Sequence, residues 1–430
     1  MTNSSSISPL PSSINKKGNI TIIGAGIIGL CSAYYLVKEG YHVTLLEQGD
    51  LLNNCSSGNA GMIVPSHFVP LAAPGMISKG IKWMFDSKSP FYVKPSLNPK
   101  LISWGLKFWK YSNQQHVDRV AEPLRDLHVL SKELYDELAK EPELNFGLEK
   151  KGILMLYKNQ ATGDEEIHLA KKAQQLGLDV AILNAKETQA LEPDTKLDIL
   201  GSVHYRCDAH LYPNNLVKQL IAYVKANGAE IITNCKVNGL EITNGEIKTI
   251  HNTKGDFAAD TVVMTGGSWL PELAQQAHLT IPIMPGKGYS FMVDPTHPIH
   301  HPALLLEARV AVTPMNGQVR FGGTMEIAPI NHKVNMNRVQ GIVNSIPQYY
   351  PDYQVAVPQI DKIWYGFRPC SPDGLPYIGY SKKLKNLIVA GGHGMMGVSL
   401  APITGKLVSE LVTDTKLSTD IGIYSPNRFN

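Results

Sequence analysis

The sequence lacks the features that mark several specialised classes of protein. Its 430 residues include five cysteines and no CxxC pair, which argues against a disulfide framework and a structural zinc site. It has no run of 18 or more apolar residues, so no transmembrane helix is expected. The net charge is only +3 and the lysines and arginines are scattered, so nucleic acid is not an expected partner. With 43% hydrophobic residues, the chain can bury the cores of two or three domains.

The first 18 residues, MTNSSSISPLPSSINKKG, are rich in Ser, Pro and Asn. They lack the basic start and apolar stretch of a secretory signal. We therefore expect a disordered leader on a protein of a reducing compartment, the cytoplasm. A cleaved or organelle-targeting leader is the alternative.

A dinucleotide-binding pattern follows the leader. Residues 19–23 (NITII) are typical of a buried parallel strand, and GAGIIG follows at once at residues 24–29. A helical stretch then runs to Gly40, and a second strand ends on Glu47, 18 residues beyond Gly29. A GxGxxG motif at the first turn of a β-α-β unit, followed by an acid at this spacing, predicts dinucleotide binding.

Each residue of this pattern has a physical role. Gly24 permits the tight turn, Gly26 allows a pyrophosphate to approach the backbone, and Gly29 lets the helix pack close to the strand. The helix N-terminus offers free N–H groups to the phosphates. Glu47 accepts hydrogen bonds from ribose hydroxyls and disfavours a 2′-phosphate, so NADP fits poorly.

Two further glycine-rich segments favour FAD over NAD. Residues 55–75 (CSSGNAGMIVPSHFVPLAAPG) replace the next βα unit of an NAD enzyme with small residues that suit an extended cofactor. A surface loop without a ligand is the alternative for this segment. Near the C-terminus, the strand NLIVAGG leads into the turn of residues 391–397 and a final helix, VSLAPITGKLVSELVT. The positive end of that helix suits the N1–C2=O side of a reduced flavin.

Residues 79–140 are predicted to be helical, with Trp83, Phe85, Trp104, Phe108 and Trp109 on apolar faces. Such aromatics more commonly pack in a core, although an aromatic-rich helix can also touch a membrane surface.

The remaining pattern divides the chain between two domains. Residues 273–360 are rich in alternating strands, with a hairpin turn at Asn316-Gly317 and a Pro/Tyr-rich connection. The predicted fold class is α/β: a Rossmann-type FAD-binding domain and a second α+β substrate domain built around a mainly antiparallel sheet. The predicted segments are 19–78, 198–272 and 361–425 for the FAD-binding domain, and 79–197 and 273–360 for the substrate domain.

Several of these motifs occur together in one known family. IIGAGIIGLCSAYYL, SSGNAGMIVPSHFVPLAAPG, KGYSF, RFGGTMEI, WYGFRPCSPDGLPYIG and GGHGMMGVSLAPITG span nearly the whole chain. The sequence resembles the FAD-dependent D-amino acid dehydrogenases, within the group that includes D-amino acid oxidase, glycine oxidase and sarcosine oxidase. The NAG…P…AAPG combination points to the dehydrogenase branch.

The resemblance implies a set of FAD-binding residues in the motifs described above and at Val237, where backbone groups would hold adenine. The set is Gly24, Ala25, Gly26, Ile27, Ile28, Gly29, Glu47, Gln48, Ser57, Asn59, Ala60, Gly61, Val237, Gly266, Gly392, His393, Gly394, Met395, Met396 and Gly397.

The resemblance also implies that Arg368 binds the substrate carboxylate, which suits a planar, always-charged guanidinium. An ion pair of Arg368 with Asp373 on the same loop is the alternative. Tyr289 and Tyr365 are candidates for hydroxyl contacts with substrate, or for packing. His67, beside the glycine-rich loop, is a candidate at the substrate or a structural histidine.

The chain departs from its glycine oxidase-like relatives at two positions. Those relatives carry a second carboxylate-binding Arg where this chain has Met395, and a Tyr where it has Ala311. The glycine oxidase substrate site therefore does not carry over directly. Arg309 is a candidate replacement, or a solvent-facing residue.

The predicted function is FAD-dependent oxidation of a D-amino acid, neutral or proline-type and including cis-4-hydroxy-D-proline. Electrons would pass to a quinone or another carrier. The alternatives are a glycine- or sarcosine-type amine oxidase that uses O₂, and a flavin-holding subunit of a complex. The predicted location is the cytoplasm, with peripheral contact at the inner membrane left open, and the sequence does not indicate an oligomeric state.

Overall fold

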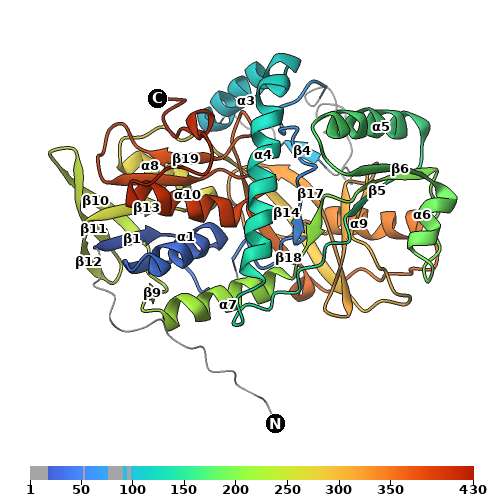
Figure 1. The fold of residues 1–430 in the computed structure, drawn as a ribbon, viewed down its shortest axis with the longest axis horizontal. Helices are drawn as coiled ribbons and strands as arrows, with labels where there is room; N and C mark the ends of the chain where they lie inside the picture. Colours follow the sequence, from blue (N-terminus) through green and yellow to red (C-terminus); the bar gives the residue numbers. More distant parts are fainter. Residues whose placement is uncertain (1–17, 52–53, 76–90, 94–97) are drawn as a thin grey trace, which may run out of the picture.

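The computed structural model describes residues 18–51, 54–75, 91–93 and 98–430. The leader, apart from residue 18, lies outside the described residues, as do Trp83 and Phe85. Two large sheets occupy the two halves of the molecule, and the long helix α4 (Gln114–Leu138) runs between them (Figure 1).

The first half contains a six-stranded sheet whose strands are parallel apart from β19 at one edge. In spatial order its strands are β19 (Tyr377–Tyr380), β20 (Leu387–Gly391), β13 (Thr261–Met264), β1 (Asn19–Ile23), β2 (His42–Leu46) and β9 (Glu230–Ile232). The order places β1 at the centre, as expected for the first strand of a Rossmann-type domain.

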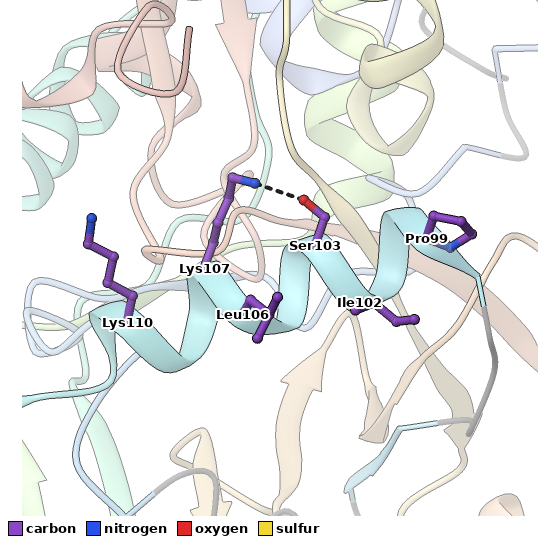
Figure 2. Close-up of a pocket in the computed structure, with 6 residues that line it drawn as sticks. All are labelled: Pro99, Ile102, Ser103, Leu106, Lys107 and Lys110. Atoms are coloured by element: carbon purple, nitrogen blue, oxygen red, sulfur yellow. Dashed lines mark hydrogen bonds between the residues drawn. The ribbon is translucent and has the colours of Figure 1, made fainter.

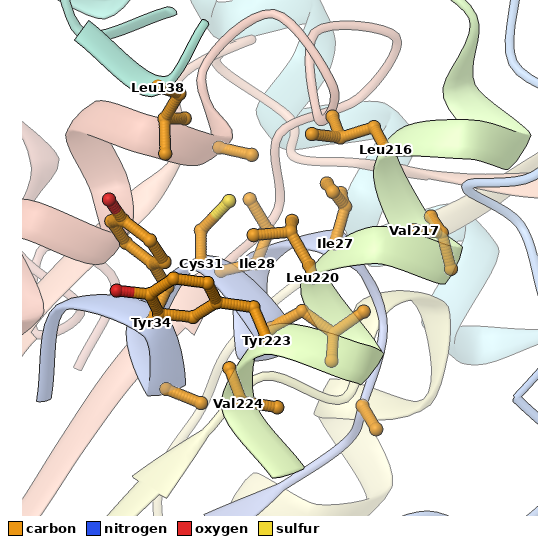
Figure 3. Packing of buried hydrophobic residues seen from close by; sticks show 14 of the residues in the cluster. Ile27, Ile28, Cys31, Tyr34, Leu138, Leu216, Val217, Leu220, Tyr223 and Val224 are labelled. Carbon is orange, nitrogen blue, oxygen red and sulfur yellow. The ribbon is translucent and has the colours of Figure 1, made fainter. Parts of the chain in front are cut away.

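Helices cover both faces of this sheet. α1 (Ile27–Lys38), α7 (Pro213–Ala226) and α10 (Ala401–Thr413) pack on one face. Figure 3 shows Ile27, Cys31 and Tyr34 of α1 meeting Leu220 and Tyr223 of α7. On the other face lie α8 (Leu270–Gln276) and a small antiparallel sheet of β10 (Val237–Thr243), β11 (Glu246–Asn252) and β12 (Gly255–Ala258). The predicted α/β fold with a Rossmann-type domain is confirmed.

The second half contains a nine-stranded, mainly antiparallel sheet. In spatial order its strands are β18 (Trp364–Cys370), β14 (Met284–Val293), β17 (Gln318–Ile327), β16 (Val310–Met315), β15 (Ala303–Leu305), β5 (Ile153–Tyr157), β7 (Gly201–Tyr205) and β6 (Val180–Asn184), with β4 (Phe91–Val93) paired to β17. The predicted hairpin joins β16 to β17, where Asn316 and Gly317 have φ of 50° and 80°. This mainly antiparallel second sheet was also predicted.

Several local predictions were wrong. Within the stretch predicted to be β-rich with a Pro/Tyr-rich connection, residues 336–349 form the helix α9 (Met336–Tyr349), because Val339, Ile342 and Ile346 recur at helical spacing and pack on the sheet. β4 is a strand inside a region predicted to be helical. Residues 201–205 and 364–370 pair in the nine-stranded sheet, although the sequence grouped them with the FAD-binding domain. The rest of the predicted division stays a prediction.

The remaining described elements complete the covering of the sheets. They are α3 (Pro99–Tyr111), α5 (Gln160–Gln175), α6 (Ala185–Leu191), the short pair β3 (Met62–Ile63) and β8 (Ala209–His210), and the 3₁₀ turns Gly267–Trp269, Ile360–Lys362 and Gly422–Tyr424. Within the described ranges, no helix combines the length and apolar character needed to cross a membrane.

Candidate functional site

A cavity of about 1080 Å³ is lined by residues of both sheets and of the loops between them. Most of the residues predicted to bind FAD line it: Gly24, Gly26, Ile27, Ile28, Glu47, Gln48, Asn59, Ala60, Val237, Gly266, Gly392, His393, Gly394, Met395, Met396 and Gly397. These residues come from six separate stretches of sequence, so the fold gathers them around one space.

The turn after β1 admits only glycine at two positions. Gly24 has φ of 109°, and a Cβ there would lie 2.8 Å from the Thr265 carbonyl oxygen. A Cβ on Gly29 would lie 2.0 Å from the Gly24 carbonyl oxygen, so α1 packs directly on the turn. The Glu47 carboxylate accepts a hydrogen bond from the Ala25 amide at 2.8 Å. Ala25 and Gly29 therefore shape the turn and do not line the cavity.

The loop after β2 is tied to this turn. The Ile27 amide donates to Ser56 Oγ at 3.1 Å, which brings the loop against the start of α1. Ser57 Oγ donates to Asn54 Oδ1 at 3.2 Å. Gly61 has φ of 74°, with the Leu211 carbonyl oxygen 2.2 Å from the position of a Cβ. Ser57 and Gly61 thus hold the loop's shape behind the cavity wall.

Arg320 anchors the same loop from the other sheet, and the sequence reasoning missed it. Its Nη1 donates to the carbonyl oxygens of Ser57 at 3.1 Å and Asn59 at 2.5 Å. Its side chain is buried, which lowers the pKa of Arg320 to about 10. The signal available in the sequence was a charged residue between Val319 and Phe321, two apolar residues of strand β17.

The C-terminal glycine-rich turn leaves open space on the cavity side. A Cβ added at Gly394 or Gly397 would meet no atom within 4 Å, and both residues line the cavity. The final helix begins at Ala401, three residues later than predicted, after a non-helical turn. The cavity is thus lined by two glycine-rich turns, one after β1 and one before α10, and the Glu47 carboxylate lies beside the first. This arrangement fits a dinucleotide such as FAD.

Arg368 lines the cavity from β18 and has no carboxylate partner among the described residues. Its Nη1 donates to the Thr324 carbonyl oxygen at 2.7 Å, and burial lowers the pKa of Arg368. The alternative pairing with Asp373 is wrong, because Asp373 binds Arg428 through two contacts of 2.7 and 3.0 Å. Arg368 therefore offers its remaining N–H donors to the cavity.

The hydroxyls of the two predicted tyrosines are close to other side chains of the protein, whereas Arg309 is exposed to solvent. Tyr289 is buried, and its hydroxyl donates to Glu326 at 2.6 Å. The Tyr365 hydroxyl lies 3.2 Å from His332 Nδ1, and Tyr365 does not line the cavity. Arg309 is exposed at the rim with φ of 54°. The substrate roles assigned to these three residues stay predictions.

His67 lines the cavity and is backed by two residues that the sequence reasoning did not select. Ser66 Oγ lies 3.1 Å from His67 Nδ1 and donates to Asp208 Oδ2 at 2.6 Å. Burial lowers the pKa of His67 to about 4 and raises the pKa of Asp208 to about 7. When Asp208 is ionised, its bond to Ser66 makes His67 Nδ1 the protonated nitrogen, so Nε2 keeps its lone pair.

Several large apolar side chains also line the cavity: Leu71, Phe91, Leu304, Met325 and Met395. Ala311 also lines the cavity, at the position where the sequence analysis noted the loss of a tyrosine. Arg368, with Arg309 at the rim and apolar side chains in the same cavity, suits a small ligand that has one anionic group and an apolar remainder.

Comparison with known proteins gives consistent results. A family model described as FAD dependent oxidoreductase matches residues 19–411. D-amino acid dehydrogenases from Helicobacter pylori and Vibrio atlanticus are each 30% identical to this chain. Those matches cover 95% and 94% of this chain, and 98% and 99% of the relatives.

Solved structures with the same fold include glycine oxidase from Geobacillus kaustophilus, with a TM-score of 0.76 and 23% identity, covering 96% of this chain and 98% of that one. L-proline dehydrogenase from P. horikoshii matches with a TM-score of 0.68 and 21% identity, again over 96% and 98%. At these identities the structural matches establish the fold.

Proposed function

Because the chain belongs to the family of FAD-dependent oxidoreductases, we propose that it oxidises a D-amino acid whose carboxylate is bound by Arg368. FAD is the cofactor, as the sequence predicted. The observation that carries the proposal is a half-buried arginine, without a carboxylate partner among the described residues, in the same cavity as the dinucleotide motif. The D-amino acid dehydrogenases among the relatives support the choice of substrate class.

Arg368 supports binding of the substrate in one orientation. Its guanidinium presents two parallel N–H donors to a carboxylate, and the carbonyl of Thr324 fixes the plane of the group. Fixing the carboxylate also fixes the position of Cα, and such positioning contributes several kcal/mol to lowering a barrier. Arg309, at the rim, is the proposed second contact for the carboxylate.

His67 is the proposed acceptor for the substrate amine. Its neutral imidazole cannot repel the amine by charge, and Nε2 accepts an N–H when Nδ1 donates to Ser66. The amine must lose a proton before its nitrogen lone pair can form the C=N bond. Asp208 and Ser66 hold the ring orientation from behind.

The proposed reaction removes hydrogen from the Cα–N bond. Cα–H leaves with its electron pair, an N–H proton leaves to solvent, and a C=N bond forms. Bound FAD supplies the two-electron acceptor for this hydrogen. Water then converts an acyclic imine to a 2-oxo acid and ammonia, whereas a proline-type substrate leaves as a cyclic imine.

The proposed substrate is a neutral or proline-type D-amino acid, including cis-4-hydroxy-D-proline. The proposed electron acceptor is a quinone or another carrier. Leu71, Phe91 and Met325 support an apolar substrate side chain, since a charged group here would be buried without a partner. A cytoplasmic location is proposed with them.

The test is anaerobic bleaching of the purified holoprotein's flavin band near about 450 nm. The substrates are D- and L-proline, cis-4-hydroxy-D-proline, D-alanine, sarcosine and glycine. Bleaching by D-forms alone is expected. Bleaching by sarcosine or glycine, with near-stoichiometric peroxide in air, would replace the proposal with an amine oxidase. No bleaching of bound FAD by any of them would favour a flavin-holding subunit.

A further inference from the structure

A buried carboxylate lies behind His67, and the pairing of two short strands puts it there. β8 pairs antiparallel with β3, with Ile63 opposite Ala209. This register brings Asp208, one residue before β8, beside the loop that follows β3 and carries His67. Asp208 is fully buried. An acid in such a position needs hydrogen-bond partners, and it finds them in that loop.

A series of hydrogen bonds connects this carboxylate to the cavity. Ser66 donates to both carboxylate oxygens of Asp208, from its hydroxyl to Oδ2 at 2.6 Å and from its amide to Oδ1 at 3.0 Å. His67 Nδ1 lies 3.1 Å from the same hydroxyl oxygen. His67 lines the cavity, and its Nε2 has no hydrogen-bond partner among the described residues. The series therefore runs without a break from Asp208 to a ring nitrogen that is open to a ligand.

The groups packed around Asp208 offset its burial only in part. Lys132, on α4, attracts the carboxylate, but its Nζ donates to the Cys207 carbonyl oxygen at 2.6 Å. The Cys207 thiol donates to Asp208 Oδ1 at 3.5 Å. On β7, the Tyr205 hydroxyl donates to Glu166 of α5 at 2.8 Å. Burial thus raises the pKa of Asp208 to about 7, so this carboxylate exchanges a proton near neutral pH.

His67 is the uncharged member of the series. Burial lowers its pKa to about 4, and burial also lowers the pKa of its titratable neighbour His128, on α4, to about 3. A neutral imidazole transfers a proton by accepting one at a ring nitrogen while it releases another from the second nitrogen. His67 can therefore pass a proton to Ser66 without becoming positively charged.

We propose that Asp208, acting through Ser66 and His67, accepts the proton that the substrate ammonium loses before oxidation. This relay rests on the proposed function, because the substrate must be an amine. The ammonium proton passes to His67 Nε2, the Nδ1 proton passes to Ser66 Oγ, and the Ser66 hydroxyl proton passes to Asp208 Oδ2. One N–H bond of the substrate breaks, one O–H bond forms at Asp208, and nothing is oxidised or reduced. After the product leaves, the reverse path returns the proton to water in the cavity.

The relay couples the tautomer of His67 to the charge of Asp208. When Asp208 is ionised, Ser66 donates to it and His67 Nδ1 carries the ring proton. When Asp208 is protonated, both hydrogen bonds reverse, and His67 Nε2 carries the ring proton. A change of tautomer near pH 7 is therefore a property of the relay that needs no substrate.

The first test is nitrogen NMR of the holoprotein, labelled at histidine nitrogen, from about pH 5 to 9. We expect His67 to stay neutral and to change from the Nε2–H to the Nδ1–H tautomer as the pH rises through about 7. Asp208→Asn and Ser66→Ala should each abolish this change.

Two matched controls should keep the tautomer change. Glu166→Gln alters a buried carboxylate that binds Tyr205 and has no bond to Ser66 or His67. Ser103→Ala removes a hydroxyl on α3, where Ser103 Oγ accepts from Lys107 at 2.8 Å (Figure 2). Flavin absorbance and the thermal midpoint show whether each variant is folded.

The second test is the pH dependence of flavin reduction, measured by rapid anaerobic mixing with the D-amino acid that bleaches the flavin. In the wild type the rate should fall only below about pH 7, where Asp208 is already protonated. In Asp208→Asn and Ser66→Ala the proton has no acceptor in the protein, so the fall should begin at the higher pKa of the amine itself. At pH 7 both variants should be at least about tenfold slower than wild type, with little difference near about pH 10.

Two results would overturn the relay. One is a His67 tautomer that does not change with pH in the wild type, or that still changes in Asp208→Asn. The other is an Asp208→Asn variant slowed by the same factor at every pH, which would leave Asp208 a structural role. Failure of the proposed function gives a different result. The wild-type flavin then stays oxidised with every D-amino acid although the tautomer changes, and the relay has no amine proton to accept.

Discussion

Two cavity arginines illustrate how neighbouring side chains with the same chemistry take different roles. Arg320 gives its donors to the loop carbonyls of Ser57 and Asn59. Arg368 gives one donor to Thr324 and keeps the others for the cavity. The first arginine therefore supports the cofactor loop, and the second is free to bind a ligand.

Replacing Arg368 should weaken substrate binding without loss of FAD. Arg368→Lys keeps the charge but not the planar pair of donors, so KM should rise about tenfold, and Arg368→Met should raise it about a hundredfold or more. The measurement is steady-state kinetics with an artificial acceptor, with flavin content per protein as the control. Arg309→Gln, which removes the proposed second contact for the carboxylate, should raise KM by about threefold, less than Arg368→Met does, because Arg309 is exposed to solvent. An unchanged KM in Arg368→Met would remove Arg368 from the substrate site.

Replacing Arg320 should instead release the cofactor loop. Arg320→Met leaves two loop carbonyls without donors, which costs about 3 kcal/mol of stability. Purified Arg320→Met should hold less FAD and unfold at lower denaturant, and Arg320→Lys should recover part of both. Flavin absorbance relative to protein and a denaturation curve measure these effects. Full FAD content in Arg320→Met would show that the loop is held by other contacts.

Site residues that lie close together in the sequence could be predicted from it, whereas residues whose partners are distant in the sequence could not. Gly24, Gly29 and Glu47 lie in one β-α-β unit, so their spacing alone predicted their place. Arg320 lies 263 residues from Ser57, and Asp208 lies 142 residues from Ser66. Only strand register and the packing of distant loops bring these pairs together, and a single sequence does not specify either directly.

At the scale of elements, the contact between α1 and α10 depends on a glycine. A Cβ on Gly405 would lie 2.5 Å from the backbone carbon of Cys31 and 2.8 Å from the Ser32 amide nitrogen. These neighbours are backbone atoms, which cannot rotate away. The two helices therefore approach at a distance that only glycine permits.

Two glycine-to-alanine changes in helices should act in opposite directions. Gly405→Ala forces α10 away from α1 and should destabilise the protein by about 2 kcal/mol. Gly105→Ala, in α3, places its Cβ where no atom lies within 4 Å, and should stabilise by about 0.5–1 kcal/mol through helix propensity. Thermal midpoints of both holoproteins measure the contrast. A Gly405→Ala variant as stable as wild type would mean that the helices separate at little cost.

The elements that were mispredicted have a common physical cause. β4 is a three-residue strand that pairs, among the described residues, with β17, more than 200 residues away in sequence. α9 was obscured by Pro347 and Tyr349 near its end, although its apolar residues recur at helical spacing. Trp109 was assigned to a core face, but the inner side of α3 is filled by Leu101 and Trp104. In each case the structure or burial of the segment is set by the distant parts of the chain that pack against it.

For the whole molecule, buried titratable groups around the cavity make stability depend on pH. Burial lowers the pKa of His67 to about 4, and of His128 and His393 to about 3. Each takes up a proton on unfolding once the pH falls below about 6.5, so its contribution to stability is present above that pH and is lost below it. Asp208, with its pKa raised to about 7, acts in the opposite direction between pH 7 and about 4.

The three histidines outweigh the single aspartate, so unfolding free energy should fall as the pH drops from about 6.5 to 4. These four groups alone, with three protons taken up and one released, contribute a slope of about 3 kcal/mol per pH unit. His128 is the clearest residue to test, because it is fully buried and its Nε2 has no hydrogen-bond partner in the part of the chain that the structure describes. His128→Met should reduce the slope by about 1.4 kcal/mol per pH unit.

Denaturant midpoints measured from pH 4 to 7 test this prediction, with His168→Met, at an exposed histidine, as the matched control. The control should keep the wild-type slope. An unchanged slope in His128→Met would mean that this histidine is protonated in the folded protein, despite its burial. A smaller slope would trace the acid sensitivity to burial of His128, the same cause that lowers the pKa of His67.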